Sequence, residues 1–283
     1  MINKNTDYSS RIDLYNKNSS LTKIIDRIKS NSRVLEFGPA KGHMTKVLKK
    51  KINCKVVCVE INTDFLNELK PYAEKVIISD IDELDWDKEF LENEKFDAII
   101  FADVLEHLYD PWFVVEKCKS LLKEDGSFFA SIPNVSHAGL VGSLLLGNFD
   151  YRPQGLLDKT HIRFFTRKSI IGLFENNGYY IHHFEEVILD WRESAFKDDL
   201  LDASGNLLEL ITRSPDSSVY QFFVEAKHMN PQNSIRISEL ENQVRNLKAS
   251  HAIAVGKFIL WTTGFLIPKF IMRKLLLRLF GKK

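Results

Sequence analysis

Runs of apolar residues recur along the first 230 positions, and the stretches between them have apolar residues spaced three and four apart. The run at 55–60 is apolar through its centre, as in strands buried on both faces of a parallel sheet. Strands that alternate with helices predict an α/β fold, here a doubly wound, mostly parallel seven-stranded sheet. The predicted strands are 33–37, 55–60, 75–80, 96–102, 127–132, 179–189 and 219–227, and the predicted helices are 21–29, 43–51, 64–72, 111–122 and 166–176.

The same pattern divides the chain into four parts. Residues 1–30 form a polar N-terminal cap that ends in a short helix, and residues 31–229 contain all the predicted strands. Within this second part, residues 133–166 are rich in glycine and interrupt the alternation, and long insertions of this kind are usually functional. We interpret them as a substrate loop. Residues 230–255 form a linker, and residues 256–283 a basic amphipathic tail.

The last two parts carry their own signals. Apolar residues at heptad spacing in 230–255 favour a short coiled coil and a homodimer, although an ordinary surface helix explains them as well. From residue 252 onward the chain has seven basic and no acidic residues, interleaved with Leu, Phe and Trp. The uncharged run 258–268 is shorter than the roughly 20 residues that span a bilayer. The tail therefore predicts a helix that lies on an anionic membrane surface, or one that packs on a protein.

Net charge changes this picture little. The whole chain carries +1, and without the tail it has 32 basic and 38 acidic residues, so charge gives no reason to expect nucleic acid. Cys54, Cys58 and Cys118 lack the spacing of a metal site, and we expect buried, reduced thiols and no metal. The polar first 20 residues do not resemble a secretory signal, so we expect a cytoplasmic protein, peripheral on the inner face of the membrane if the tail binds there.

Acidic residues follow four consecutive predicted strands. Open α/β sheets bind ligands outside the carboxyl ends of their strands. Glu60 comes 24 residues after Glu36, close to the spacing at which an acid binds ribose hydroxyls in dinucleotide folds. Four acids would repel a diphosphate, whereas a ligand with a ribose and a positive charge fits them. The four residues are Glu36, Glu60, Asp80 and Asp103.

These acids lie in motifs that resemble class I S-adenosylmethionine-dependent methyltransferases, which have a Rossmann-like fold. The resemblance covers about residues 18–228. The motifs are VLEFGPAKG at 34–42, VEI at 59–61, SDI at 79–81, FADVLEHL at 101–108 and SIPN at 131–134.

The resemblance implies a role for each motif. Glu36 and the turn from Gly38 to Gly42 would hold the methionine end of the cofactor, partly through backbone groups. Ala40 occupies the place of a middle glycine common in the family, and we expect a negative φ there. The other implied cofactor-binding residues are Phe37 in the first motif, Glu60 and Ile61 at the ribose, Asp80 and Ile81 at the adenine, and Ala102 and Asp103 near the methionyl group.

The segment 158–166, DKTHIRFFT, is the most informative part of the substrate loop. It resembles methyltransferases often encoded among bacterial surface-polysaccharide genes. An oxygen acceptor needs a base, and His is the usual choice, so we predict that His161 is the base or orients the acceptor, near Arg163 and Asp103. Alternatively, His161 and Arg163 brace the loop against Asp158 or Asp103.

Five further residues are weaker candidates. Glu106 and His107 could be catalytic, or they order the turn that contains them. His137, Tyr151 and Arg152 are more often structural in such loops.

The predicted reaction is methyl transfer from S-adenosylmethionine to an oxygen or nitrogen of a saccharide or glycolipid precursor. The second interpretation is methylation of a quinone or another lipid-soluble small molecule. The third is a scaffold that binds the cofactor without turnover.

Overall fold

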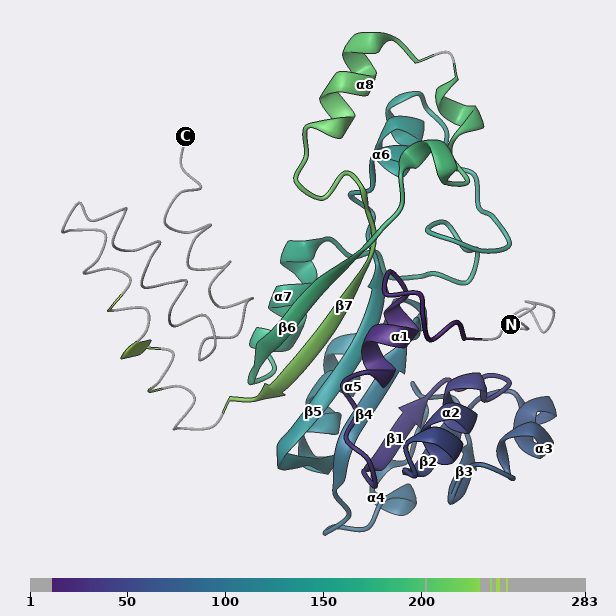
Figure 1. Ribbon diagram of the computed structural model, residues 1–283, viewed down its shortest axis with the longest axis vertical. Helices are drawn as coiled ribbons and strands as arrows, with labels where there is room; N and C mark the ends of the chain where they lie inside the picture. The colour runs from purple at the N-terminus through teal and green to yellow at the C-terminus, as the bar shows by residue number, and fades with distance from the viewer. Residues whose placement is uncertain (1–11, 202, 230–234, 236–237, 240–242, 244–283) are drawn as a thin grey trace.

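A computed structural model describes residues 12–201 and 203–229, together with the separate positions 235, 238–239 and 243. Its centre is a seven-stranded sheet in the order β3-β2-β1-β4-β5-β7-β6 (Figure 1). The first five strands are parallel, and β7 lies antiparallel to both of its neighbours. The strands are β1 Arg33–Phe37, β2 Lys55–Glu60, β3 Lys75–Ile78, β4 Phe96–Ala102, β5 Leu122–Pro133, β6 Tyr179–Ile188 and β7 Val219–His228.

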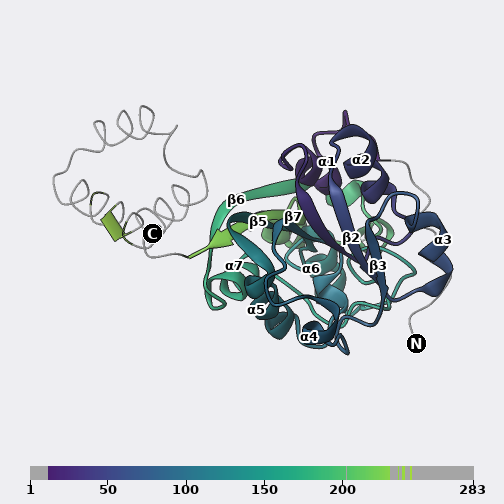
Figure 2. The same cartoon turned by 90° about the horizontal axis from the view of Figure 1, so that it is seen from below.

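Helices cover both faces of the sheet (Figure 2). The helices α1 (Ser20–Ile25) and α2 (His43–Lys51) lie on one face, and α4 (Trp86–Glu89), α5 (Pro111–Leu121) and α7 (Arg167–Glu175) on the other. Successive residues of a strand point to opposite faces, so Val34 joins the hydrophobic cluster under α1 and α2, while Leu35 joins the cluster under α5 and α7. This burial on both faces explains why the centres of β2 and β4 are apolar at successive positions.

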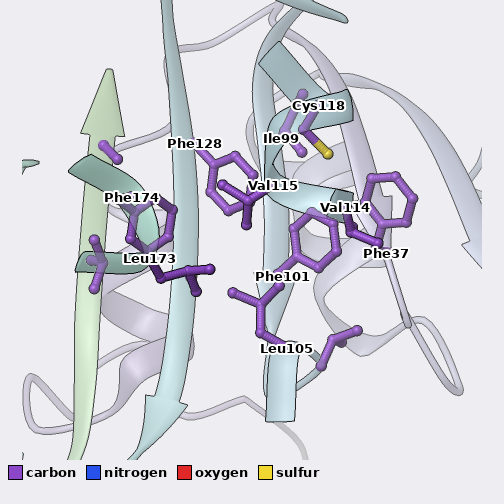
Figure 3. Close-up of a cluster of buried hydrophobic side chains, with 14 of the residues drawn as sticks. Phe37, Ile99, Phe101, Leu105, Val114, Val115, Cys118, Phe128, Leu173 and Phe174 are labelled. Carbon is purple, nitrogen blue, oxygen red and sulfur yellow. The ribbon is translucent and has the colours of Figure 1, made fainter. Parts of the chain in front are cut away.

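Aromatic rings fill the larger of these two clusters (Figure 3). Phe101 of β4 stacks on Phe37 of β1 and on Phe128 of β5, with ring centroids 4.3 and 5.1 Å apart. All three side chains are almost fully buried. The row of rings therefore ties together the three central strands directly below the end of the sheet that carries Asp103.

A small third layer lies beyond that end of the sheet (Figure 1). It contains α6 (Ala138–Leu145) and α8 (Gly205–Thr212), together with the 3-10 turns Trp191–Glu193 and Asp198–Leu200. Ala138, Leu200 and Ile211 form its buried cluster. The fully buried Asn134 joins the layer to the sheet, because its Nδ2 donates to the Val219 carbonyl at 2.7 Å.

The N-terminal helix α1 is bound to β6, the edge strand at the end of the sheet opposite β3. Ser19 caps α1 by accepting from the Thr22 N–H. Lys23 pairs with Glu185 of β6 at 2.9 Å, and Arg27 bonds to the same carboxylate. The cap therefore closes over β6 and β7.

The predicted fold is confirmed, with local differences. The helix expected over 64–72 is a 3-10 turn, Thr63–Phe65, followed by α3, Leu66–Leu69, because Pro71 has no N–H with which to continue the helical hydrogen bonds. The helix expected over 21–29 ends at Ile25. Helix α4 was not predicted, because it has only four residues and depends on the Asp85 side chain, which accepts from the Lys88 N–H at 3.2 Å.

The coiled coil and the basic tail fall almost entirely outside the described residues, so the homodimer and the membrane surface stay predictions. Within residues 12–201 and 203–229 no helix has the length and apolar character needed to cross a membrane.

Candidate functional site

Glu36 lies near the end of β1 and is 2% exposed. It points toward α2, where the Thr45 hydroxyl donates to its Oε2 at 2.7 Å. Burial, opposed by this hydrogen bond, raises the pKa of the carboxyl to about 7. A carboxylate held in this way favours a positively charged group in its vicinity.

The turn after β1 brings the backbone close to the end of β4. Gly38 has a φ of 63°, and a Cβ at this position would lie 2.7 Å from Cγ2 of Val104. Gly42 has a φ of 70° and faces Leu69 in the same way. Both glycines are therefore required by conformation and by space.

The expectation of a negative φ at Ala40 is wrong. Its φ is 48°, in the left-handed region that costs a residue with a Cβ on the order of 1 kcal/mol. The reason is a hydrogen bond, because this geometry lets the Ala40 N–H donate to Oε2 of Glu60 at 2.9 Å. The turn is thereby fixed to the end of the neighbouring strand.

Glu60 ends β2 and is buried to 5% exposure. Its other oxygen, Oε1, accepts from the Asn62 N–H at 2.8 Å. Burial raises the pKa of Glu60, and the two backbone N–H groups oppose this effect. Each carboxylate oxygen keeps a second lone pair, so the residue can still accept from a ligand hydroxyl.

The remaining predicted cofactor residues line the same edge of the sheet in different ways. Asp80 follows β3 and is half-buried, with Oδ1 accepting from the Asp82 N–H at 3.0 Å. Ile81 is buried, and Ile61 is 42% exposed. The side chain of Phe37 packs in the core, so only its backbone can reach a ligand at this edge.

Asp103 directly follows β4 and Ala102. It has a φ of 57°, and its N–H donates to Ser131. The residue is exposed at the end of the sheet, yet the surrounding protein partly desolvates its carboxyl and thereby raises its pKa to about 6. Gln221 of β7 donates to Oδ1 of Asp103. Gln221 was not predicted from the sequence, because its contact with Asp103 depends on the pairing of β7 with β5.

Ala40 and Asp103 share an unusual property. Among the described residues other than glycine, a positive φ occurs only at these two and at Asn31 and Asn53. Asparagine and aspartate tolerate the left-handed region better than most residues that carry a side chain, whereas alanine adopts it less readily. Backbone strain of this kind clusters at functional sites, and here both residues flank the carboxyl ends of β1 and β4.

Glu106, His107 and His161 come together beside Asp103. The first two lie in the 3-10 turn Leu105–His107, and His161 comes from the substrate loop. The loop docks on this turn because the N–H groups of Ile162 and Arg163 both donate to the Glu106 carbonyl, at 3.0 and 2.9 Å. The rings of His107 and His161 meet edge to face at 4.7 Å.

The other loop candidates brace the structure. Arg163 donates from Nε to the Tyr109 carbonyl at 3.1 Å, rather than to Asp158 or Asp103. His137 caps α6 and contacts the Leu189 carbonyl at 2.8 Å. Arg152 pairs with Asp199 at 2.8 Å, while Tyr151 is 59% exposed.

Comparison with known families identifies this arrangement. Residues 11–184, more than half of the chain, match the family described as "Methyltransferase domain". The chain belongs to this methyltransferase family. The methyltransferase has the seven-stranded sheet that the sequence predicted, and its family is consistent with S-adenosylmethionine as the methyl donor.

Curated relatives resemble only part of the methyltransferase. It is 30% identical over 108 residues to the ubiquinone biosynthesis O-methyltransferase of Actinobacillus pleuropneumoniae serotype 7 (strain AP76). The matched region covers 36% of this chain and 46% of that relative. It is 27% identical over 150 residues to the protein of the same name from Colwellia psychrerythraea, covering 52% and 60%. The match therefore spans about half the length of these relatives.

A solved structure shows the same fold over most of the chain. The SAM-dependent methyltransferase from Archaeoglobus fulgidus has a TM-score of 0.51 and 20% identity to this protein, covering 74% of this chain and 92% of that one. At this identity the likeness concerns the fold.

Proposed function

We propose that the enzyme methylates an oxygen of a lipid-soluble small molecule of the quinone or polyphenol class. Two curated relatives named as ubiquinone biosynthesis O-methyltransferases support this acceptor over the saccharide that the sequence favoured. The structural observation that carries the proposal is an exposed apolar surface within the substrate loop.

Exposed apolar side chains gather along the end of α6 and the loop that follows. Phe149 contacts Tyr151 and Phe164, with ring centroids 5.6 and 6.3 Å apart. Phe164 adjoins Arg163, in the part of the loop that docks on Glu106. Clustered apolar surface of this kind marks a binding site. The exposed members are Leu144, Leu145, Leu146, Phe149, Tyr151 and Phe164.

The cofactor pocket is proposed at the carboxyl ends of β1 to β4. Bound S-adenosylmethionine supplies a methyl group on a sulfonium sulfur, which leaves as a neutral thioether when an acceptor oxygen attacks the methyl carbon. The buried Glu36 carboxyl, whose pKa is raised to about 7, fits a cationic ligand. The lone pairs left on Glu60 fit a diol, and Asp80 with Ile81 would hold the adenine.

Replacing Glu60 with alanine is expected to weaken binding of S-adenosylhomocysteine about ten- to a hundredfold. The variant loses a charged hydrogen-bond acceptor, worth about 1.5–3 kcal/mol, and it frees the strained Ala40 turn. Calorimetric titration measures the change, with the exposed Glu83→Ala as the matched control. Equal affinities in two folded variants would contradict the ribose role of Glu60.

His161 is proposed to act on the acceptor, as a base or by orienting it. Replacing it with alanine is then expected to lower kcat about a hundredfold or more, with unchanged binding of S-adenosylhomocysteine. His137→Ala is a useful comparison, because that ring packs in the third layer away from the His161 cluster. Near-normal turnover in a folded His161→Ala enzyme would remove this role.

A saccharide acceptor remains the second candidate, because the segment 158–166 resembles methyltransferases encoded with polysaccharide genes. Transfer of radiolabelled methyl groups to a panel of catechols, hydroquinones, sugar nucleotides and lipid-linked sugars separates the two. We expect product only with the aromatic hydroxyl compounds. Product only with the sugars would overturn the proposal, and binding of S-adenosylhomocysteine with no product from any acceptor would favour a scaffold.

A further inference from the structure

The side chain of Glu106 is 1% exposed, and neither of its carboxylate oxygens has a hydrogen-bond partner. Among the described residues, four buried polar side-chain atoms lack a partner, and two of them belong to this one carboxylate. Burying an ionised carboxylate without compensation is among the most costly arrangements in a protein. Burial, together with the charge of Asp103, raises the pKa of Glu106 well above its usual range.

Two histidines face this carboxylate with their rings already oriented. Nδ1 of His107 lies 3.1 Å from the Thr160 carbonyl, and Nδ1 of His161 lies 3.2 Å from the Leu156 carbonyl. A carbonyl only accepts, so each Nδ1 carries its proton and donates. The lone pair of each ring is therefore on Nε2.

Histidine ligands of metals show the same arrangement, in which the ring nitrogen that does not bind the metal donates to a backbone carbonyl. Thr160 is held in turn, because its hydroxyl and its N–H both donate to Oδ1 of the buried Asp158, at 2.7 and 2.8 Å. The orientation of His107 thus rests on a chain of hydrogen bonds that extends into the loop.

The distances suit a cation better than an ion pair. Nε2 of His161 lies 3.9 Å from Oε1 of Glu106, too far for a hydrogen bond. One donor atom from each of Glu106, His107 and His161 lies within 4.8 Å of the other two. Ligands about 2.1 Å from a common metal are roughly 3–4 Å apart. Burial also lowers the pKa of both histidines, which keeps them neutral and able to ligate.

We propose that Glu106, His107 and His161 bind a divalent transition-metal ion, zinc or manganese, beside Asp103. Two imidazoles and one carboxylate form the donor set of catalytic zinc sites, which keep a coordination position open. The sequence did not indicate this site, because its ligands lie in two segments more than 50 residues apart.

The open coordination position could bind the acceptor, and this step rests on the proposed function. An acceptor hydroxyl bound there would lose its proton to solvent, because a divalent cation lowers the pKa of an oxygen that it coordinates. The resulting oxyanion is the nucleophile that attacks the methyl carbon. His161 then positions the ion and is not the base itself.

Calorimetry on the EDTA-treated full-length protein, titrated with Zn²⁺ or Mn²⁺ alone, tests the site. We expect one ion per chain with micromolar affinity or tighter, and a higher melting temperature with the ion present. Glu106→Gln should weaken binding at least a hundredfold, since changing even a residue that only orients a metal ligand costs about ten- to a hundredfold. His161→Gln serves as a second variant if the first does not fold.

Two controls locate the ion. Glu116→Gln changes an exposed carboxylate of α5 and should leave binding intact. His183→Gln changes a second group that could hold an ion, formed by His182, His183 and Glu225 among the described residues, and should also leave binding intact. Loss of binding in His183→Gln, undiminished binding in Glu106→Gln, or no binding by the wild type would each overturn the proposal. Titration of the same samples with S-adenosylhomocysteine reports separately on the proposed function.

Discussion

Replacing Phe101 with alanine is expected to lower the free energy of unfolding by about 3–5 kcal/mol. The side chain is 0% exposed, and its ring stacks on both Phe37 and Phe128, so truncation leaves a cavity between three central strands (Figure 3). Unfolding in urea, monitored by circular dichroism, measures the change in unfolding free energy.

The control for Phe101→Ala is Leu210→Ala on α8, which removes a side chain that is 62% exposed and should change stability by no more than about 0.5 kcal/mol. A loss below 1 kcal/mol in Phe101→Ala would mean that the ring row does not hold the sheet together. The variant should also weaken cofactor binding, because Phe101 precedes Ala102 and Asp103 on the same strand.

Glu36→Gln is expected to change the unfolding free energy of the ligand-free protein in a pH-dependent way. The change should be about 3 kcal/mol more favourable at pH 8 than at pH 4.5. The folded-state pKa of about 7 lies above the ordinary value of 4.5, so the folded state binds the proton more tightly than the unfolded state does. This stabilising contribution is complete below about pH 4.5 and is lost as the pH rises through 7. An amide at this position does not ionise, so the loss disappears.

The measurement is the difference in unfolding free energy between wild type and variant, taken at both pH values, which cancels the titration of other groups. Glu116→Gln, with an exposed side chain, should show no such pH dependence. If the difference in unfolding free energy between wild type and variant were the same at pH 4.5 and pH 8, the pKa of Glu36 would not be raised in the folded state. If Glu36 serves the cofactor, the stabilised variant also binds S-adenosylhomocysteine more weakly.

Most of the fold was predictable because its signals are local. Strands β1, β2 and β4 and helix α2 have the predicted bounds, since each is a mostly apolar run or a helix that follows a glycine turn. The four acids were predictable for the same reason. In a parallel sheet, a residue at the end of a strand lies at the ligand-binding edge whatever the rest of the chain does.

The missed features depend on pairs that are distant in sequence. Ala40 has a positive φ because Glu60 accepts its N–H from the next strand. Gln221 reaches Asp103 only because β7 pairs with β5. Arg163 contacts the Tyr109 carbonyl, which no spacing indicates. The cluster of Glu106 with two histidines likewise exists only when the loop docks on the turn after β4.

The position of β7 has a consequence for synthesis on the ribosome. Strand β6 is made before β7, yet it joins the sheet only through β7, which lies between it and β5. Until residue 228 has left the exit tunnel, the edge of β5 stays open and β6 has no partner. A nascent chain that stalls before residue 219 has no β7, so its β6 cannot join the sheet. The exposed edge of β5 is then a site at which unfinished chains can aggregate.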